Sequence, residues 1–115
     1  ALPGVSTRYR GDTRIILPNS PSLLEADSDF RIKVIILSQE EILEAGLFWK
    51  HLENDEYQNI PLEHLARGVY RATLPANHFS RKDFEYYIRA TTRDEKVLYP
   101  ATAEETNLTV VVMSR

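Results

Sequence analysis

Apolar and polar residues alternate along short segments of this chain, which is the period of a strand with one buried face. Residues 30–34 read Phe, Arg, Ile, Lys, Val, and the apolar run continues to Leu37. Residues 83–91 alternate most clearly. There the inner face would carry Phe84, Tyr86, Ile88 and Ala90, and the outer face Glu85, Tyr87, Arg89 and Thr91. Both segments predict half-buried β-strands.

Shorter apolar segments bounded by turn residues predict further strands. Pro18 and Pro21 end the first of them, Arg67-Gly68 forms a turn, and Pro75 ends the strand that follows it. Asn107 to Met113 forms the last strand, and its run Val110–Met113, like Val34–Leu37, is typical of a buried strand. The remaining predicted strands cover residues 14–17, 47–52, 57–62, 69–74 and 97–100.

This spacing of strands and turns predicts an all-β fold with roughly seven short strands. We expect a two-sheet antiparallel β-sandwich of the immunoglobulin (Ig) or fibronectin type III kind. Residues 1–13, polar and without a period, form a linker or N-terminal extension, and residues 14–115 form one domain. The predicted structural core includes Trp49, Tyr70, Phe84, Tyr86 and Ile88.

Residues 38–46 are compatible with two local structures. Ser38-Gln39-Glu40-Glu41 has the form of a capping box before Ile42 to Gly46, which would support a helix of one or two turns. Such a short helix is marginal in isolation. A loop between two strands is therefore the other possibility.

The alternation of inward and outward side chains on two strands places one candidate interaction patch on the surface. If Trp49 is in the core, Phe48 and Lys50 point outward, and if Phe84 and Tyr86 are in the core, Tyr87 and Arg89 point outward. These strands would be neighbours, so the four residues Phe48, Lys50, Tyr87 and Arg89 would form an exposed apolar and cationic patch. Three interpretations remain open: an interface with a neighbouring domain, a platform for stacking sugars, or a face with ordinary cross-strand pairs or with inward and outward positions exchanged.

Size and charge exclude several classes of protein. The chain has 115 residues, enough for one core, and a formal net charge of −3. We expect no nucleic-acid partner, because phosphate binding needs clustered cations. The chain has no cysteine, and no apolar run approaches the ~20 residues of a membrane-spanning helix, so we expect no disulfide and no membrane insertion.

No pattern of catalytic or metal-binding residues is found. His51, His64 and His78 lack ligand spacing, and the chain contains neither HExxH nor GxSxG. Adjacent acids such as Glu40-Glu41 would point to opposite faces of a strand. We therefore expect no catalytic residue, no metal and no cofactor. Arg10-Gly11-Asp12 and the sequon Asn107-Leu108-Thr109 are short motifs that occur often by chance.

Four segments resemble recurring strands of one group of proteins. Gly68 to Pro75 matches a "GxYxAxLP" pattern and Phe84 to Ala90 an "xEYYIxA" pattern. Tyr99 to Ala103 is similar to a "YPAxAP" turn, and Ala45 to Lys50 is similar to an "AxLxYR" strand. Together, over about residues 30–113, the chain resembles bacterial Ig-like or fibronectin type III-like accessory modules. It departs from them in having no glycine in Thr92–Lys96 and no acidic residue at Thr91-Thr92.

The resemblance implies a setting and a role. Such modules belong to large secreted enzymes, often ones that act on polysaccharides. It implies a noncatalytic spacer or interaction module, extracellular or periplasmic, whose partners are neighbouring domains of the same polypeptide. The alternatives are a carbohydrate-binding module that uses exposed aromatic residues on a polysaccharide, and a stand-alone adhesion domain.

Overall fold

The computed structural model describes residues 11–113, which form ten strands and one helical turn. Arg10 lies outside the described residues, so the structure describes only Gly11 and Asp12 of the Arg-Gly-Asp motif. The elements are β1 (Arg14–Ile16), β2 (Leu23–Glu25), β3 (Phe30–Leu37), β4 (Glu44–His51), β5 (Gln58–Pro61), β6 (Glu63–Ala66), β7 (Val69–Leu74), α1 (Ala76–Phe79), β8 (Phe84–Thr91), β9 (Lys96–Tyr99) and β10 (Leu108–Met113).

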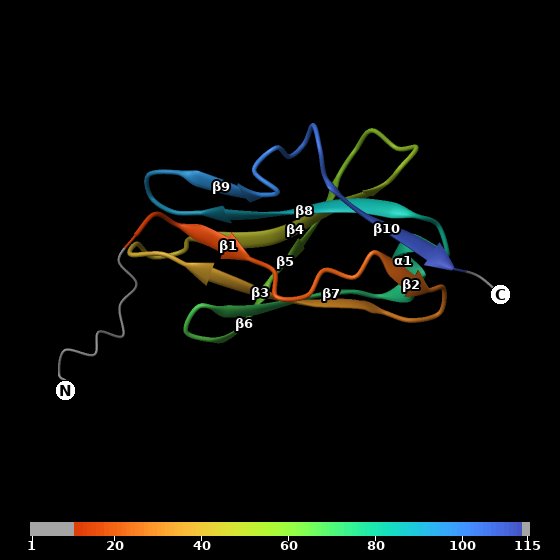
Figure 1. The fold of residues 1–115 in the computed structure, drawn as a ribbon, viewed down its shortest axis with the longest axis horizontal. Coiled ribbons are helices and arrows are strands. Elements are labelled where there is room, and N and C mark those ends of the chain that lie inside the picture. The colour runs from red at the N-terminus through yellow and green to blue at the C-terminus, as the bar shows by residue number, and fades with distance from the viewer. Residues whose placement is uncertain (1–10, 114–115) are drawn as a thin grey trace.

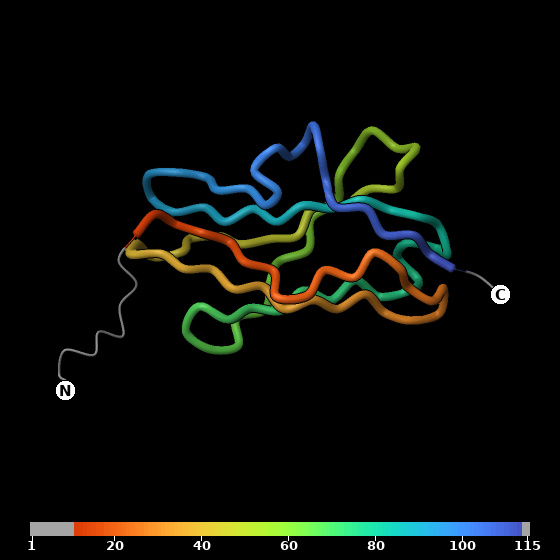
Figure 2. The backbone as a smooth tube through the Cα atoms, viewed as in Figure 1, coloured from red at the N-terminus to blue at the C-terminus, as the bar shows by residue number. Residues whose placement is uncertain are grey.

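The strands form two sheets that face each other, as Figures 1 and 2 show from the side. One sheet has four strands in the order β1-β3-β7-β6. The other has six, in the order β2-β10-β8-β4-β5, and β9 pairs with β8 as well. The predicted all-β, two-sheet fold is confirmed.

The alternation of residue types decides which face of each strand is buried. In β3, Phe30, Ile32, Val34 and Ile36 are buried, whereas Arg31 and Lys33 are exposed. In β8 the inward set of Phe84, Tyr86, Ile88 and Ala90 is fully buried. Trp49 from β4 lies between the sheets, with its ring 6.0 Å from that of Phe84 and almost perpendicular to it. The core assignments of Trp49, Phe84, Tyr86 and Ile88 are confirmed.

Tyr70 is the exception among the predicted core residues. It is half-buried, and its ring stacks on His64 of the edge strand β6, with centroids 4.6 Å apart. Because only the exposed strand β6 lies beyond β7, a residue at this point contributes to the rim of the core.

Two features of the fold differ from the expectation, and one alternative that the sequence left open is decided. The described residues form ten strands instead of about seven, because β2 and β6 have three and four residues and no clear alternation. The sheets are not wholly antiparallel, since β2 runs parallel to β10. Of the two structures compatible with residues 38–46, the helix is absent and the loop is present up to residue 43, because Leu43 N donates to Thr91 O and β4 begins at Glu44.

Local backbone features agree with the turn signals. Gly68 has a φ of 71°, which places the β6–β7 turn in the left-handed region that glycine adopts at little cost. Its carbonyl accepts a hydrogen bond from Ile36 N. No helix in the described part of the chain is long and apolar enough to cross a membrane.

Candidate functional site

The structure brings together the four residues predicted to form a patch on the six-stranded sheet. Phe48 of β4 lies opposite Tyr87 of β8, and the two rings stack with centroids 5.1 Å apart and planes 7° apart. The Arg89 guanidinium carbon lies 4.3 Å from the centroid of Phe48. Lys50 lies opposite Glu85, with its Nζ 3.6 Å from Glu85 Oε1. The prediction that these residues share one face is correct.

The prediction that this patch is exposed is wrong for Tyr87, which is only 3% exposed. The rings of Tyr57 and Tyr87 pack edge to face with centroids 5.2 Å apart, and the Tyr87 hydroxyl donates a hydrogen bond of 3.0 Å to Glu104 Oε2. Phe48, Lys50 and Arg89 are half-buried. The alternation of a strand indicates which face a residue occupies, but not what covers that face.

Two loops supply the cover. The β4–β5 loop brings Tyr57, and the β9–β10 loop brings Glu104 and Asn107; Figure 1 shows both loops rising on the outer side of the six-stranded sheet. We call the resulting group the outer-face cluster: Phe48, Lys50, Tyr57, Glu85, Tyr87, Arg89, Glu104 and Asn107. Sequence reasoning missed Tyr57, Glu104 and Asn107, which carry no local signal of this contact.

Polar contacts join the two loops to the sheet. Asn107 Nδ2 donates to Tyr57 Oη and to Glu85 Oε1, at 2.6 Å each. Lys50 Nζ donates to the Asn54 carbonyl at 2.9 Å and lies 5.7 Å from the Tyr57 ring centroid. The Asn107 amide of the sequon is thus already engaged within the domain.

The electrostatics of the cluster keep Tyr87 protonated. Burial, and then the hydrogen bond and negative charge of Glu104, raise the pKa of Tyr87 to about 12. At neutral pH this side chain is a hydrogen-bond donor and not a base. The arrangement therefore holds two loops on the sheet, and its central ring is not available as a bare stacking surface.

A second surface was not predicted. Leu23 on β2 and Val111 and Met113 on β10 are 58%, 43% and 46% exposed. Val111 lies directly opposite Leu23, and Met113 follows two residues later on the same face. We call Leu23, Val111 and Met113 the apolar edge patch. The prediction that Val110–Met113 is a buried strand is therefore half wrong, because only Val110 and Val112 point inward.

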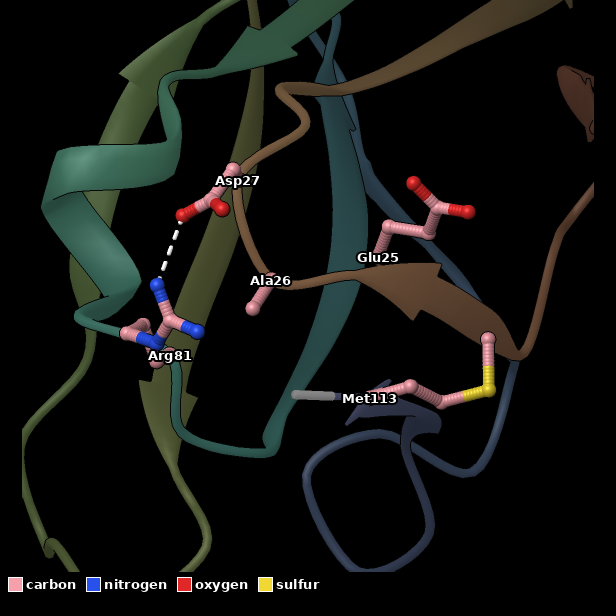
Figure 3. A pocket seen from close by; sticks show the side chains of 5 residues that line it. All are labelled: Glu25, Ala26, Asp27, Arg81 and Met113. Atoms are coloured by element: carbon pink, nitrogen blue, oxygen red, sulfur yellow. Dashed lines mark hydrogen bonds and ion pairs between the residues drawn. The ribbon is translucent and has the colours of Figure 1, made fainter. Parts of the chain in front are cut away.

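A cavity of about 420 Å³ adjoins this patch. Its lining consists of Glu25, Ala26, Asp27, Arg81 and Met113 (Figure 3). Arg81 reaches across from the turn after α1, and its Nη1 lies 2.7 Å from Asp27 Oδ1. Ser80 and Arg81 both have positive φ, 52° and 61°, a backbone conformation that costs energy for residues other than glycine.

Two of the three histidines have side-chain contacts within the domain. His51 Nε2 donates to the Phe79 carbonyl at 2.8 Å, which places the proton on Nε2 and leaves Nδ1 as an acceptor facing Asn54 Nδ2. His64 stacks on Tyr70, and His78 is exposed. Among residues 11–113, no group of three His, Asp or Glu side chains is arranged to hold a metal ion.

Comparison with known proteins shows the fold. A scan of protein-family models and a search of curated proteins found no match. Among solved structures, the endo-β-1,4-mannanase from Thermotoga petrophila is similar, with a TM-score of 0.64 and 11% identity, over 97% of this chain and 21% of that one. An engineered protein matches with a TM-score of 0.60 and 8% identity, over 89% of this chain and 20% of that one.

A third similar chain belongs to a structure on T cell specificity and activation by the bacterial superantigen toxic shock syndrome toxin-1. It has a TM-score of 0.57 and 9% identity, and the match covers 90% of this chain and 100% of that one. This chain thus spans about one fifth of the length of the first two structures. At these identities the likeness defines a class only: the chain is an all-β, two-sheet sandwich domain.

Proposed function

We propose that this chain is a noncatalytic Ig-like module of a larger secreted protein, and that it acts as a spacer or contact domain for neighbouring domains. The observation that carries the proposal is the apolar edge patch, in which Leu23, Val111 and Met113 are adjacent and exposed. Contiguous exposed apolar residues mark contact surfaces in soluble proteins. Methionine is also enriched where proteins meet.

The strand order supports the Ig-like part of the proposal. Ig domains have one sheet in the order A-B-E-D and a second containing G-F-C, with C′ added in variable-type domains. Here β1-β3-β7-β6 follows the first order and β10-β8-β4-β5 the second. The buried Trp49 lies on β4, the strand equivalent to C, where Ig domains carry a core tryptophan.

The comparisons support the setting. The chain matches one fifth of a mannanase, as expected of one module in a longer polypeptide. A secreted, carbohydrate-active parent protein is consistent with this match and with the motifs of residues 68–75 and 84–90.

The geometry favours contact with protein over the carbohydrate-binding alternative on the six-stranded sheet. A sugar-stacking platform needs an accessible ring face, and Tyr87 is covered by Tyr57 and the Glu104 loop. A stand-alone adhesion domain would use the same apolar edge patch, but it would bind a separate protein and not a neighbouring domain of its own polypeptide.

The test uses Met113, the only methionine in the chain. Exposed thioethers are oxidised by peroxide, and a covering domain slows that reaction. We expect Met113 to be oxidised several-fold more slowly in the full-length polypeptide than in the isolated domain, as measured by peptide mass spectrometry. The substitution Val111→Lys should restore fast oxidation in the full-length polypeptide.

The matched control is Leu65→Lys, a change at an equally exposed leucine on the edge strand β6. It should leave the protection of Met113 intact. Equal oxidation rates in the isolated and full-length forms would overturn the proposal that neighbouring domains cover this patch.

A further inference from the structure

The outer face of the four-stranded sheet is lined by cations. Arg31 and Lys33 point outward from β3, Arg71 from β7 and Arg14 from β1, and all four are exposed. Their side chains lie opposite to the buried set of the same strands, so they share one surface on the far side of the sandwich from the outer-face cluster. We call these four residues the basic face.

Charge is distributed unevenly over the molecule. The chain has 17 acidic and 14 basic residues, and because Arg8, Arg10 and Arg115 lie outside the described residues, residues 11–113 hold 17 acids and 11 bases. The four cations of the basic face have two acidic partners, Glu63 and Asp29. The face is thus net positive on a domain that is net negative.

The pairing of cations on this face works against folding. Lys33 lies directly opposite Arg71 in the ladder between β3 and β7. Like charges directly opposite each other destabilise a sheet, whereas an acidic residue at position 33 would stabilise it. Arg71 is neutralised from β6, where Glu63 Oε1 accepts from its Nη2 at 2.7 Å and its Nε at 3.2 Å.

Two of the cations are available to a ligand. The side chains of Lys33 and Arg14 make no ion pair or hydrogen bond within the part of the chain that the structure describes. Arg31 is held by Asp29 at 3.5 Å, and its side chain is two thirds exposed. A local conflict of this kind, with no gain to the fold, is typical of functional surfaces.

We propose that the basic face binds an acidic polysaccharide, one that carries carboxylate or sulfate groups. Arg31 and Lys33, two residues apart on one strand, are spaced by about 7 Å, and Lys33 and Arg71 on neighbouring strands by about 5 Å. Arg14 lies opposite Leu37, four residues further along β3 than Lys33. A flat group of three close cations with a fourth farther along the same face fits a linear polymer with repeating charges. Arginine forks bind carboxylate and sulfate oxygens in pairs, and lysine adds a point charge.

The outward side chains next to Lys33 and Arg71 along the same strands are apolar. Ile35 of β3 lies opposite Ile16 of β1 and Val69 of β7, and all three are half-buried. This row offers a contact for the C–H faces of sugar rings beside the charged groups. A nucleic acid is a poorer fit, because four cations with two acids among them neutralise few phosphates. The inference concerns the opposite sheet from the apolar edge patch and does not depend on it.

The experiment is affinity electrophoresis or calorimetry of the domain with polygalacturonate and with a sulfated glycan, at low and high salt. Neutral mannan, duplex DNA and polyglutamate serve as comparison ligands. We expect binding to at least one of the acidic glycans, weaker at high salt, and markedly weaker binding to the comparison ligands. Lys33→Glu combined with Arg31→Gln should lower the affinity by about tenfold or more, since two charge-assisted contacts are lost.

The stability of the same variants separates binding from folding. Lys33→Glu places an acid opposite Arg71, so its free energy of unfolding should equal or exceed that of the wild type. The control, Lys82→Glu combined with Arg93→Gln, makes the same change in net charge at exposed positions away from this face. The proposal is overturned by failure to bind either acidic glycan, by an equal loss of affinity in the control, or by equally tight binding of DNA or polyglutamate.

Discussion

Replacing Tyr87 with alanine would remove the ring at the centre of the outer-face cluster. Tyr87 is 3% exposed; its ring stacks on Phe48 and packs edge to face with Tyr57, and its hydroxyl donates a hydrogen bond to Glu104. Truncating a buried aromatic residue to alanine costs about 3–5 kcal/mol. Because loops cover this site, it can collapse more easily than the core, and we expect about 3 kcal/mol. An exposed tyrosine would cost less than about 0.5 kcal/mol.

The assay is urea unfolding followed by circular dichroism, with Tyr87→Phe alongside. Phenylalanine keeps the ring and loses only the bond to Glu104, whose side chain is exposed, so we expect a loss of about 1 kcal/mol. Hydrogen exchange should locate the effect of Tyr87→Ala, with faster exchange in the 52–57 and 100–107 loops and little change in the β3–β7 ladder. A loss below about 1 kcal/mol for Tyr87→Ala would refute the argument that the loops bury this ring.

Three further outcomes follow from the same structure. Trp49→Ala should destabilise the domain by about 4 kcal/mol in urea unfolding, because the ring is 1% exposed between the sheets; a loss under about 2 kcal/mol would contradict that packing. The folded state binds the Tyr87 proton more tightly than the unfolded chain does, since burial and Glu104 raise the pKa of Tyr87 from 10.0 to about 12. This stabilisation is complete below pH 10 and is lost as the pH rises to about 12, so the urea midpoint should fall over that range, and fall less in Tyr87→Phe. Gly68→Ala should cost about 1 kcal/mol at a φ of 71°, whereas Gly68→Asn should cost less, and a neutral alanine variant would argue against this turn geometry.

Much of the fold could be predicted from local patterns. The alternation in β3 and β8 assigned both strands and their buried faces. The prediction that Trp49 of β4 is a core residue was also correct. Gly68 marked a turn that needs a positive φ. Such features depend on the backbone period and on residues within one turn, so they are visible in the sequence itself.

The short strands could not be predicted in the same way. Three residues of β2 carry too little alternation to indicate a strand, and β2 forms because Val111, almost ninety residues later, lies opposite Leu23. The parallel direction of that pair, and the exposure of Val111 and Met113 beside it, depend on where two distant segments meet.

The candidate patch shows the same division between local and distant information. Alternation along each strand predicted that Phe48 and Lys50 share one face and that Tyr87 and Arg89 share one face, and the pairing of β4 with β8 joins the two sets. The burial of Tyr87 depends on the tertiary structure. Its cover comes from Tyr57 and Glu104, thirty residues before it and seventeen after, and no local pattern encodes which loop folds back onto which face. The period of the backbone determines where a side chain points, and contacts between distant segments determine what it meets there.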